Sequence, residues 1–249
     1  VSMLVFLICT AFTAWAGEVT LTILHTNDSH GAGAEVTKKA FSYAQIAALA
    51  DSITPRPVLL DAGDIVEGSV FASETEGLLS INAMRLAGYD AVTLGNHEFN
   101  RFRKSTIERL TGAAGGSLKG NAVTIVNANV SGSSELDKLP AYTIIERDGV
   151  RIGVFGLTTT STMGTANPAH NKGLTFEHGI TVAESTVAEM KALSANKRSP
   201  IILALGHMGF EQGMSEPEYD LSEAVAPQVD GIDLVIDADV HQVMLGAGS

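Results

Sequence analysis

The sequence predicts a single α/β domain built on mixed β-sheet, for three reasons. Apolar runs of strand length recur along the chain, helical spacing of apolar residues separates some of them, and one pair of runs is joined by a hairpin turn. Runs without polar alternation are typical of strands that are covered on both faces. The 249 residues contain no internal repeat or linker and are enough for one domain with a substantial core.

Six apolar runs are predicted as strands, and two further runs as a hairpin. The hairpin spans residues 142–158 and turns at Asp148-Gly149, a dipeptide typical of tight β-turns, so part of the sheet is antiparallel. Helical spacing over residues 46–53 and 183–193 predicts two helices, the second behind a capping-box pattern formed by Thr181 and Glu184. The six single strands are residues 19–26, 57–62, 91–95, 122–130, 200–206 and 233–237.

Residues 1–16 are predicted to be a signal peptide. An unbroken apolar stretch ends in Ala14-Trp15-Ala16, which matches a small-x-small cleavage site, and it is too short for a comfortable transmembrane helix. The alternative is a buried N-terminal helix. Cleavage predicts a periplasmic or secreted protein, and the bulky Ile8 before Cys9 argues against a lipid anchor.

Cysteine content and charge narrow the class of protein further. Cys9 is the only cysteine and lies inside the predicted signal, so the mature chain cannot form a disulfide and suits a bacterial periplasm. A net charge of −12 argues against binding to a nucleic-acid polymer, which requires a basic face. An acidic protein that handles phosphorylated substrates needs metal ions or local cationic groups.

Polar residues follow five of the predicted strands, at the ends where open α/β sheets form binding crevices. Taken singly, each has an ordinary explanation as a loop residue, a helix N-cap or a turn residue. Together they offer oxygen and nitrogen ligands for divalent ions, and the absence of thiolates favours zinc, manganese, iron or magnesium-like ions. Asp28 and His30 are two residues apart, so in an extended chain they project to the same side. The residues are Asp28, His30, Asp64, Asn96, His97, His207, Asp239 and His241.

Four motifs carry a resemblance to a known family. "LTILHTNDSHG", "LLDAGDIVEGS", "GYDAVTLGNHEFN" and "ILALGHMG" resemble, in order and approximate spacing, the 5′-nucleotidase branch of the calcineurin-like metallophosphoesterases. The resemblance spans about residues 20–245. It implies a four-layer α/β/β/α metallophosphatase sandwich with mixed sheets, with a catalytic domain over residues 17–249. It also implies C-terminal truncation, because these nucleotidases continue into a nucleotide-specificity domain.

The resemblance further implies a site for two divalent metal ions, with zinc, manganese, cobalt and magnesium as candidates. His97 resembles the catalytic histidine that stabilises the phosphoryl group and helps the leaving oxygen to depart, and with Asn96 it would contact the substrate. The first ion would be held by Asp28, His30 and His241, the second by Asn96 and His207, and both by Asp64.

Two positions depart from the family pattern. Asn100 stands where nucleotidases usually have an aspartate that orients the catalytic histidine; an amide can orient the ring but lacks the charge. Asp239 stands where the family has a metal-binding histidine, and its oxygen would shift metal preference toward magnesium or manganese.

The expected function is therefore that of an exported, metal-dependent hydrolase of nucleoside 5′-monophosphates or similar small phosphate esters. One alternative is a 2′,3′-cyclic-nucleotide phosphodiesterase/3′-nucleotidase, a group that often reads "GNHEFN", as residues 95–100 do here. The other is a degenerate, non-catalytic relative that acts as a binding protein. The expected partner is a nucleotide or small phosphate-ester substrate, with no nucleic-acid polymer and no stable membrane anchor.

Overall fold

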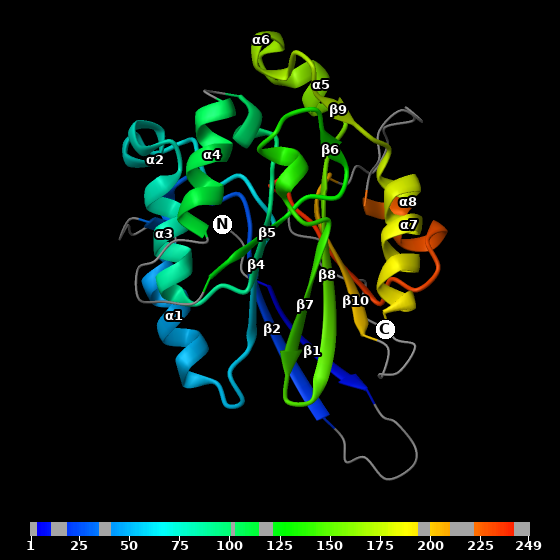
Figure 1. Ribbon diagram of the computed structural model, residues 1–249. Coiled ribbons are helices and arrows are strands. Elements are labelled where there is room, and N and C mark those ends of the chain that lie inside the picture. The colour runs from blue at the N-terminus through cyan, green and yellow to red at the C-terminus, as the bar shows by residue number, and fades with distance from the viewer. Residues whose placement is uncertain are drawn as a thin grey trace.

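Two β-sheets lie face to face with helices on both outer sides, as Figure 1 shows. The computed structural model describes residues 4–10, 19–34, 41–100, 103–114, 122–193, 200–209 and 222–241. Apolar side chains of both sheets meet in the middle, and separate apolar clusters lie under the helices on each side. The predicted four-layer α/β/β/α sandwich is confirmed.

The first sheet has five strands in the order β1-β2-β3-β4-β5. Strands β2 to β5 are parallel, and β1 pairs antiparallel with β2 at the edge. Four of these strands follow the predicted apolar runs. The bounds are β1 Leu4–Thr10, β2 Val19–Thr26, β3 Val58–Asp61, β4 Ala91–Thr93 and β5 Thr124–Val126.

The second sheet has the order β11-β10-β8-β7. Strands β8, β10 and β11 are parallel, while β7 and β8 form the predicted antiparallel hairpin. Its turn residues Asp148 and Gly149 have φ of 51° and 77°, the left-handed conformation that such turns require. The bounds are β7 Tyr142–Arg147, β8 Val150–Thr158, β10 Ile201–His207 and β11 Leu234–Ile236.

The prediction of one strand over residues 122–130 is wrong. After β5 the chain turns, and β6 (Val130–Ser131) pairs instead with β9 (Thr175–Phe176) in a separate two-stranded sheet. Asn127 causes the turn: its Oδ1 accepts from the Val130 amide at 3.1 Å, and its Nδ2 donates to the Val130 carbonyl at 2.7 Å. A side chain that bonds its own backbone three residues on competes with strand pairing.

Helices α1 to α4 cover the first sheet, and α7 and α8 cover the second (Figure 1). Helix α1 begins at a capping box, in which Ser42 and Gln45 bond each other's backbone amides. The predicted capping box at Thr181 is wrong, because α7 begins two residues earlier, at Gly179. The bounds are α1 Tyr43–Ser52, α2 Val70–Thr75, α3 Leu78–Ala87, α4 Arg103–Ala114, α5 Thr162–Thr165, α6 Pro168–Asn171, α7 Gly179–Ala192 and α8 Ser222–Gln228, with 3₁₀ turns η1 Ala32–Ala34, η2 His97–Phe99 and η3 Leu136–Lys138.

The layer between the sheets explains why the predicted strands are apolar without alternation. Side chains on one face of the central strands, such as β2, β3, β8 and β10, contact the opposite sheet, and those on the other face contact helices. The inter-sheet layer contains the buried residues Leu21, Ile23, Val58, Leu60, Ala62, Ala91, Val126, Ile152, Val154, Leu203, Leu205, Ile236 and Ala238.

Part of the predicted signal peptide contributes a strand, since β1 lies within residues 1–16 and pairs with β2 along its whole length. The predicted cleavage site at residues 14–16 lies outside the described residues, and cleavage stays a prediction. Within the described ranges, no helix is both long and apolar enough to cross a bilayer.

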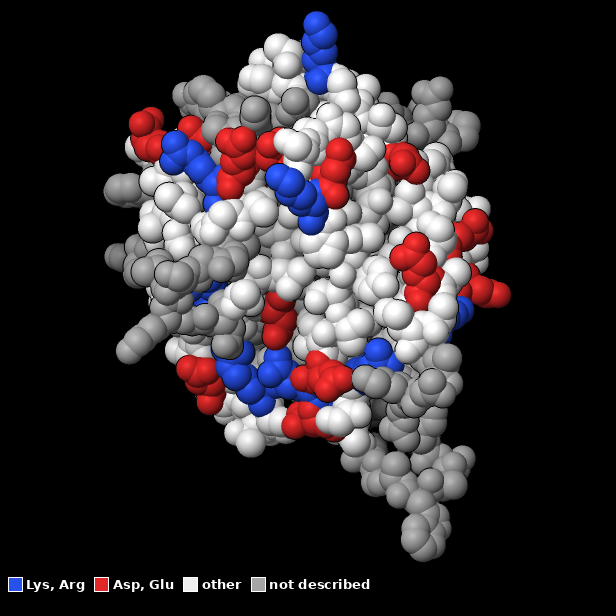
Figure 2. Space-filling view, in the orientation of Figure 1, with Lys and Arg blue, Asp and Glu red and all other residues white. Residues whose placement is uncertain are grey.

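Charged side chains of both signs are interspersed on the face shown in Figure 2. Ion pairs among the described residues include Arg56 with Asp51 at 3.3 Å, Arg109 with Glu76 at 3.3 Å and Arg147 with Asp90 at 2.9 Å.

Candidate metal centre

The candidate ligands converge from both sheets at the carboxyl ends of their strands. The sequence predicted that these residues follow strands, but not that they come from two different sheets. The site therefore forms only when the sheets are packed together. The loops after β2, β3 and β4 of the first sheet supply Asp28, His30, Asp64, Asn96 and His97, while β10 and the segment after β11 in the second sheet supply His207, Asp239 and His241.

Left-handed backbone conformation brings several of these side chains together. Asp28 and His30 have φ of 48° and 46°, so their backbone is not extended. The prediction that they project to the same side because they alternate along an extended chain is therefore wrong. Such a residue costs roughly 1–2 kcal/mol relative to ordinary backbone. Hydrogen bonds from the Asp28 amide to the Gly63 carbonyl (3.1 Å) and from the His30 amide to the Asp64 carbonyl (2.9 Å) hold this loop in place. The other ligand candidates with positive φ are Asp64 (60°), Asp239 (92°) and His241 (53°).

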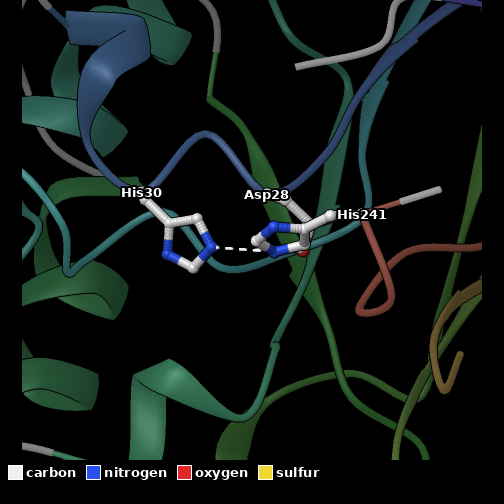
Figure 3. A group of neighbouring side chains, drawn as sticks. All are labelled: Asp28, His30 and His241. Atoms are coloured by element: carbon white, nitrogen blue, oxygen red, sulfur yellow. Dashed lines mark hydrogen bonds and ion pairs between the residues drawn. The ribbon is translucent and has the colours of Figure 1, made fainter.

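Asp28, His30 and His241 form the first group of potential ligands, shown in Figure 3. Their ligand atoms all lie within 4.8 Å of one another. The Nε2 atoms of His30 and His241 face each other at 3.1 Å, and His241 Nε2 lies 3.4 Å from Asp28 Oδ1. Two imidazole lone pairs cannot approach this closely unless a proton or a cation lies between them. This arrangement fits a bound cation.

Asp28, Asp64 and His207 form a second, fully buried group. The His207 Nδ1 donates to the Ala62 carbonyl at 2.6 Å, so in the neutral ring, the form that binds a metal ion, Nε2 carries the lone pair. That Nε2 lies 3.2 Å from Asp64 Oδ2 and 3.2 Å from Asn96 Oδ1. The geometry places a nitrogen, carboxylate oxygens and an amide oxygen around one point.

Asp239 lies beside the second group. Its Oδ1 is 3.6 Å from His207 Nε2, and its amide donates to both Asp28 carboxylate oxygens at 3.3 Å. The side chain is 29% exposed, so it faces the open side of the centre. An oxygen donor is therefore present where the family resemblance expects an imidazole.

His97 faces the centre through one ring nitrogen and the protein through the other. Its Nε2 lies 3.8 Å from Asp64 Oδ2, and its ligand atom groups with those of His30 and Asp64 within 4.8 Å. Its backbone amide donates to Asp64 Oδ1 at 2.9 Å. On the far side, Nδ1 lies 2.9 Å from Glu67 Oε2 and 3.2 Å from Asn100 Nδ2.

Sequence reasoning missed two acidic residues of the site, Glu67 and Glu98. Glu98 is only 1% exposed and accepts hydrogen bonds from the amides of Asp64 (3.1 Å), Ile65 (2.8 Å) and Gly95 (2.6 Å). It ties the loop after β3 to the loop after β4. The available signal was its place directly after His97 in "GNHE", where an acidic side chain has backbone amides within reach.

The electrostatics of the centre favour bound cations. Burial raises the pKa of Asp64, but the charges and hydrogen bonds of His207 and His97 outweigh it and hold that pKa at about 2. Burial likewise disfavours imidazolium at His207 and His97, yet nearby carboxylates raise the pKa of both above the usual range. Buried carboxylates need a compensating positive charge, which divalent ions would supply.

A buried carboxyl beneath the site predicts how stability depends on pH. Burial raises the pKa of Asp61 to about 8, and Thr26 Oγ1 (2.5 Å) and the Gly63 amide (2.9 Å) are its hydrogen-bond partners. Because the folded pKa lies above the unfolded one, this group stabilises the fold at low pH and loses that contribution as pH rises toward 8.

We expect Asp61→Asn to remove this pH dependence, because the amide mimics the neutral acid. Urea unfolding of the metal-free protein between about pH 5 and 9 should show the free energy of unfolding of the wild type falling by a few kcal/mol more than that of the variant. Parallel curves for the two proteins would show that Asp61 is ionised in the fold. Exposed Asp148→Asn is the matched control.

The family model for calcineurin-like phosphoesterases matches residues 21–243. The chain belongs to the calcineurin-like phosphoesterase family. Among the relatives of this phosphoesterase is the 5′-nucleotidase of Rattus norvegicus, 32% identical over 235 residues, which cover 87% of this chain and 37% of that protein. Another is the trifunctional nucleotide phosphoesterase protein YfkN of Bacillus subtilis, 29% identical over 250 residues, which cover 90% of this chain and 16% of that protein.

Solved structures agree with these relatives. The calcineurin-like phosphoesterase YfkN from Bacillus subtilis superposes with a TM-score of 0.69 at 26% identity, covering 91% of this chain and 74% of that chain. A 5′-nucleotidase precursor from Thermus thermophilus gives a TM-score of 0.68 at 27% identity, covering 88% of this chain and 41% of that chain. The predicted resemblance to the 5′-nucleotidase branch is confirmed. The present chain spans only 16% of the length of the Bacillus subtilis YfkN protein and 37% of the length of the Rattus norvegicus 5′-nucleotidase.

Proposed function

We propose that this phosphoesterase is an exported enzyme that hydrolyses nucleoside 5′-monophosphates or similar small phosphate esters with two divalent metal ions. The observation that carries the proposal is the position of Asp64, whose carboxylate lies within reach of ligand groups from both sheets and also of His97. The names of the relatives, 5′-nucleotidase and nucleotide phosphoesterase, support the substrate class.

The residues of the chain divide the work between holding cations and handling the substrate. Asp28, His30 and His241 would hold one ion, His207 with Asn96 the other, and Asp64 both. When bound, such a pair of ions supplies charge neutralisation and an acidified water for attack on phosphorus. His97 would stabilise the phosphoryl oxygens and give a proton to the leaving oxygen through Nε2, the ring atom that faces Asp64.

Asp239 bears on the choice of ion. Its carboxylate lies next to His207, so the second position would be richer in oxygen donors than the family pattern. Oxygen-rich sites favour magnesium or manganese over zinc. We infer that manganese or magnesium supports more activity than zinc.

A second candidate activity, hydrolysis of 2′,3′-cyclic nucleotides, is favoured by Asn100. Its amide nitrogen lies 3.2 Å from His97 Nδ1, in the position that the family gives to aspartate. The two activities differ in substrate and share the same metal centre.

Turnover of 5′-AMP and of 2′,3′-cyclic AMP, with manganese, magnesium, zinc or cobalt added to the metal-stripped protein, tests both. We expect hydrolysis of 5′-AMP to dominate, and His97→Ala to lower kcat by about 10²- to 10⁴-fold, the usual contribution of a general acid. The exposed His178→Ala at the start of α7 is the control. Dominant cleavage of the cyclic substrate would select the second candidate, and cleavage of neither would indicate a non-catalytic binding protein.

A further inference from the structure

We propose that Glu67 is the positioning residue for His97: its carboxylate accepts the Nδ1 proton and holds the ring with Nε2 toward the metal centre. The inference deepens the proposed function and rests on it for the catalytic part. It assigns to a residue from the loop after β3 the role that the family resemblance gave to position 100, where this chain has an asparagine.

The geometry around the ring favours Glu67. Its Oε2 lies 2.9 Å from His97 Nδ1, within the range of a charge-assisted hydrogen bond, whereas Asn100 Nδ2 lies at 3.2 Å. The Glu67 side chain is 23% exposed, so this bond is partly shielded from water. The contact between Glu67 and His97 links the loop after β3 to the loop after β4, as the hydrogen bonds of Glu98 also do.

The position of the proton on His97 Nδ1 decides whether Glu67 or Asn100 forms the hydrogen bond to this nitrogen. A neutral imidazole nitrogen either donates or accepts, and a carboxylate can only accept. With Glu67 as acceptor, Nδ1 must carry the proton, so it cannot also accept from the Asn100 amide. The Asn100 side chain then either turns its amide oxygen toward Nδ1 or makes no hydrogen bond to the ring, since the orientation of an amide is assigned from its hydrogen-bond network. Nε2, which faces Asp64, is left as the nitrogen that meets the substrate, and in the imidazolium form it carries the proton for the leaving oxygen.

The backbone around Glu67 holds the carboxylate in place. The next residue, Gly68, has φ of 114°, and a Cβ there would lie 2.5 Å from the Cβ of His30. Ser69 follows as the N-cap of α2, where its Oγ accepts from the Ala72 amide at 3.1 Å. Glu67 therefore sits on a short segment fixed at its C-terminal side, and its side chain needs little ordering to reach His97.

Steady-state kinetics on 5′-AMP test the positioning role. We expect Glu67→Ala to lower kcat by about 10- to 100-fold, the usual cost of losing such a partner, with KM changed less than about threefold. Glu67→Gln, which keeps an acceptor oxygen, should fall between it and the wild type. Adding Asn100→Asp to Glu67→Ala should restore at least about fivefold, because a carboxylate then reaches Nδ1 from the other side. The matched control is Glu74→Ala, an exposed residue of α2.

Two kinetic outcomes would overturn the inference: a kcat for Glu67→Ala within about twofold of the wild type, or a loss that Asn100→Asp leaves unchanged. A spectroscopic measurement makes the test independent of activity. In the metal-free protein we expect a downfield proton resonance from His97 Nδ1–H, which the His97→Ala variant assigns by losing it. This resonance should be absent in Glu67→Ala and present in Asn100→Ala. Its persistence in Glu67→Ala would also overturn the inference. If the wild type cleaves no ester, the proposed function fails while this resonance still tests the Glu67–His97 contact.

Discussion

Replacing Asp64 by asparagine is expected to lower kcat by about 10³-fold or more and to reduce the amount of bound divalent metal. Its carboxylate is the shared member of two ligand groups, one with His30 and His97 and one with Asp28 and His207. Metal ions contribute several kcal/mol to phosphoryl transfer, and each 1.4 kcal/mol is a factor of ten in rate. Metal content measured by mass spectrometry beside kcat checks the expectation.

The control for this change is Asp148→Asn, which removes one negative charge from the exposed turn of the β7–β8 hairpin. It should leave both metal content and kcat unchanged. Full metal content in Asp64→Asn would contradict the assignment of Asp64 as a shared ligand. Loss of metal with full activity would contradict the metal-dependent function itself.

Replacing Gly95 by alanine is expected to lower the free energy of unfolding by about 3 kcal/mol and to abolish activity, because the added Cβ has no space. It would lie 2.1 Å from Asp64 Oδ1 and 2.7 Å from the Asp64 backbone nitrogen. The loop cannot move aside easily, since the Gly95 amide donates to buried Glu98 at 2.6 Å. Urea unfolding and metal content measure the two effects.

The matched control is Gly164→Ala in α5, where an added Cβ meets no heavy atom within 4 Å. Its free energy of unfolding should change by less than about 1 kcal/mol. If Gly95→Ala were as stable as this control, the loops after β3 and β4 would be less tightly packed than the structure indicates.

Both expectations depend on the same physical feature: the candidate metal centre lies between the two sheets and takes residues from both. His207 from β10 donates to the carbonyl of Ala62 after β3, and the Asp239 amide donates to Asp28. A ligand that binds only the folded protein stabilises it in proportion to the logarithm of its concentration. Bound metal should therefore strengthen the packing of the sheets on each other.

The elements that local pattern determines were predictable. The β7–β8 hairpin follows from Asp148-Gly149 and the central strands from continuous apolar runs, because turn chemistry and burial act over a few residues. The two wrong predictions of element boundaries have local causes that the apolar pattern does not reveal. Asn127 bonds Val130 and ends a strand early, and α7 begins before the capping pattern at Thr181.

The site shows the same division. That Asp28, Asp64, His207 and His241 follow strands was visible in the sequence, and so were the motifs of the family. The reason that Asp28 and His30 converge was not, because their left-handed backbone is maintained by hydrogen bonds to the Gly63 and Asp64 carbonyls in the loop after β3. Glu67 was missed because its partner His97 is 30 residues away, and Glu98 because only Gly95 among its partners is close in the sequence, while Asp64 and Ile65 are not.

By itself, then, the sequence determined the central strands, their order along the chain, the residue types offered at their ends and the family. These properties depend on local propensity, burial period and motif spacing. Only the tertiary structure decided that residues from two sheets meet in one candidate metal centre, that Glu67 rather than Asn100 has the shorter contact to His97, and that Asp239 lies beside His207. Those contacts depend on how distant segments pack, and packing is a property of the whole fold.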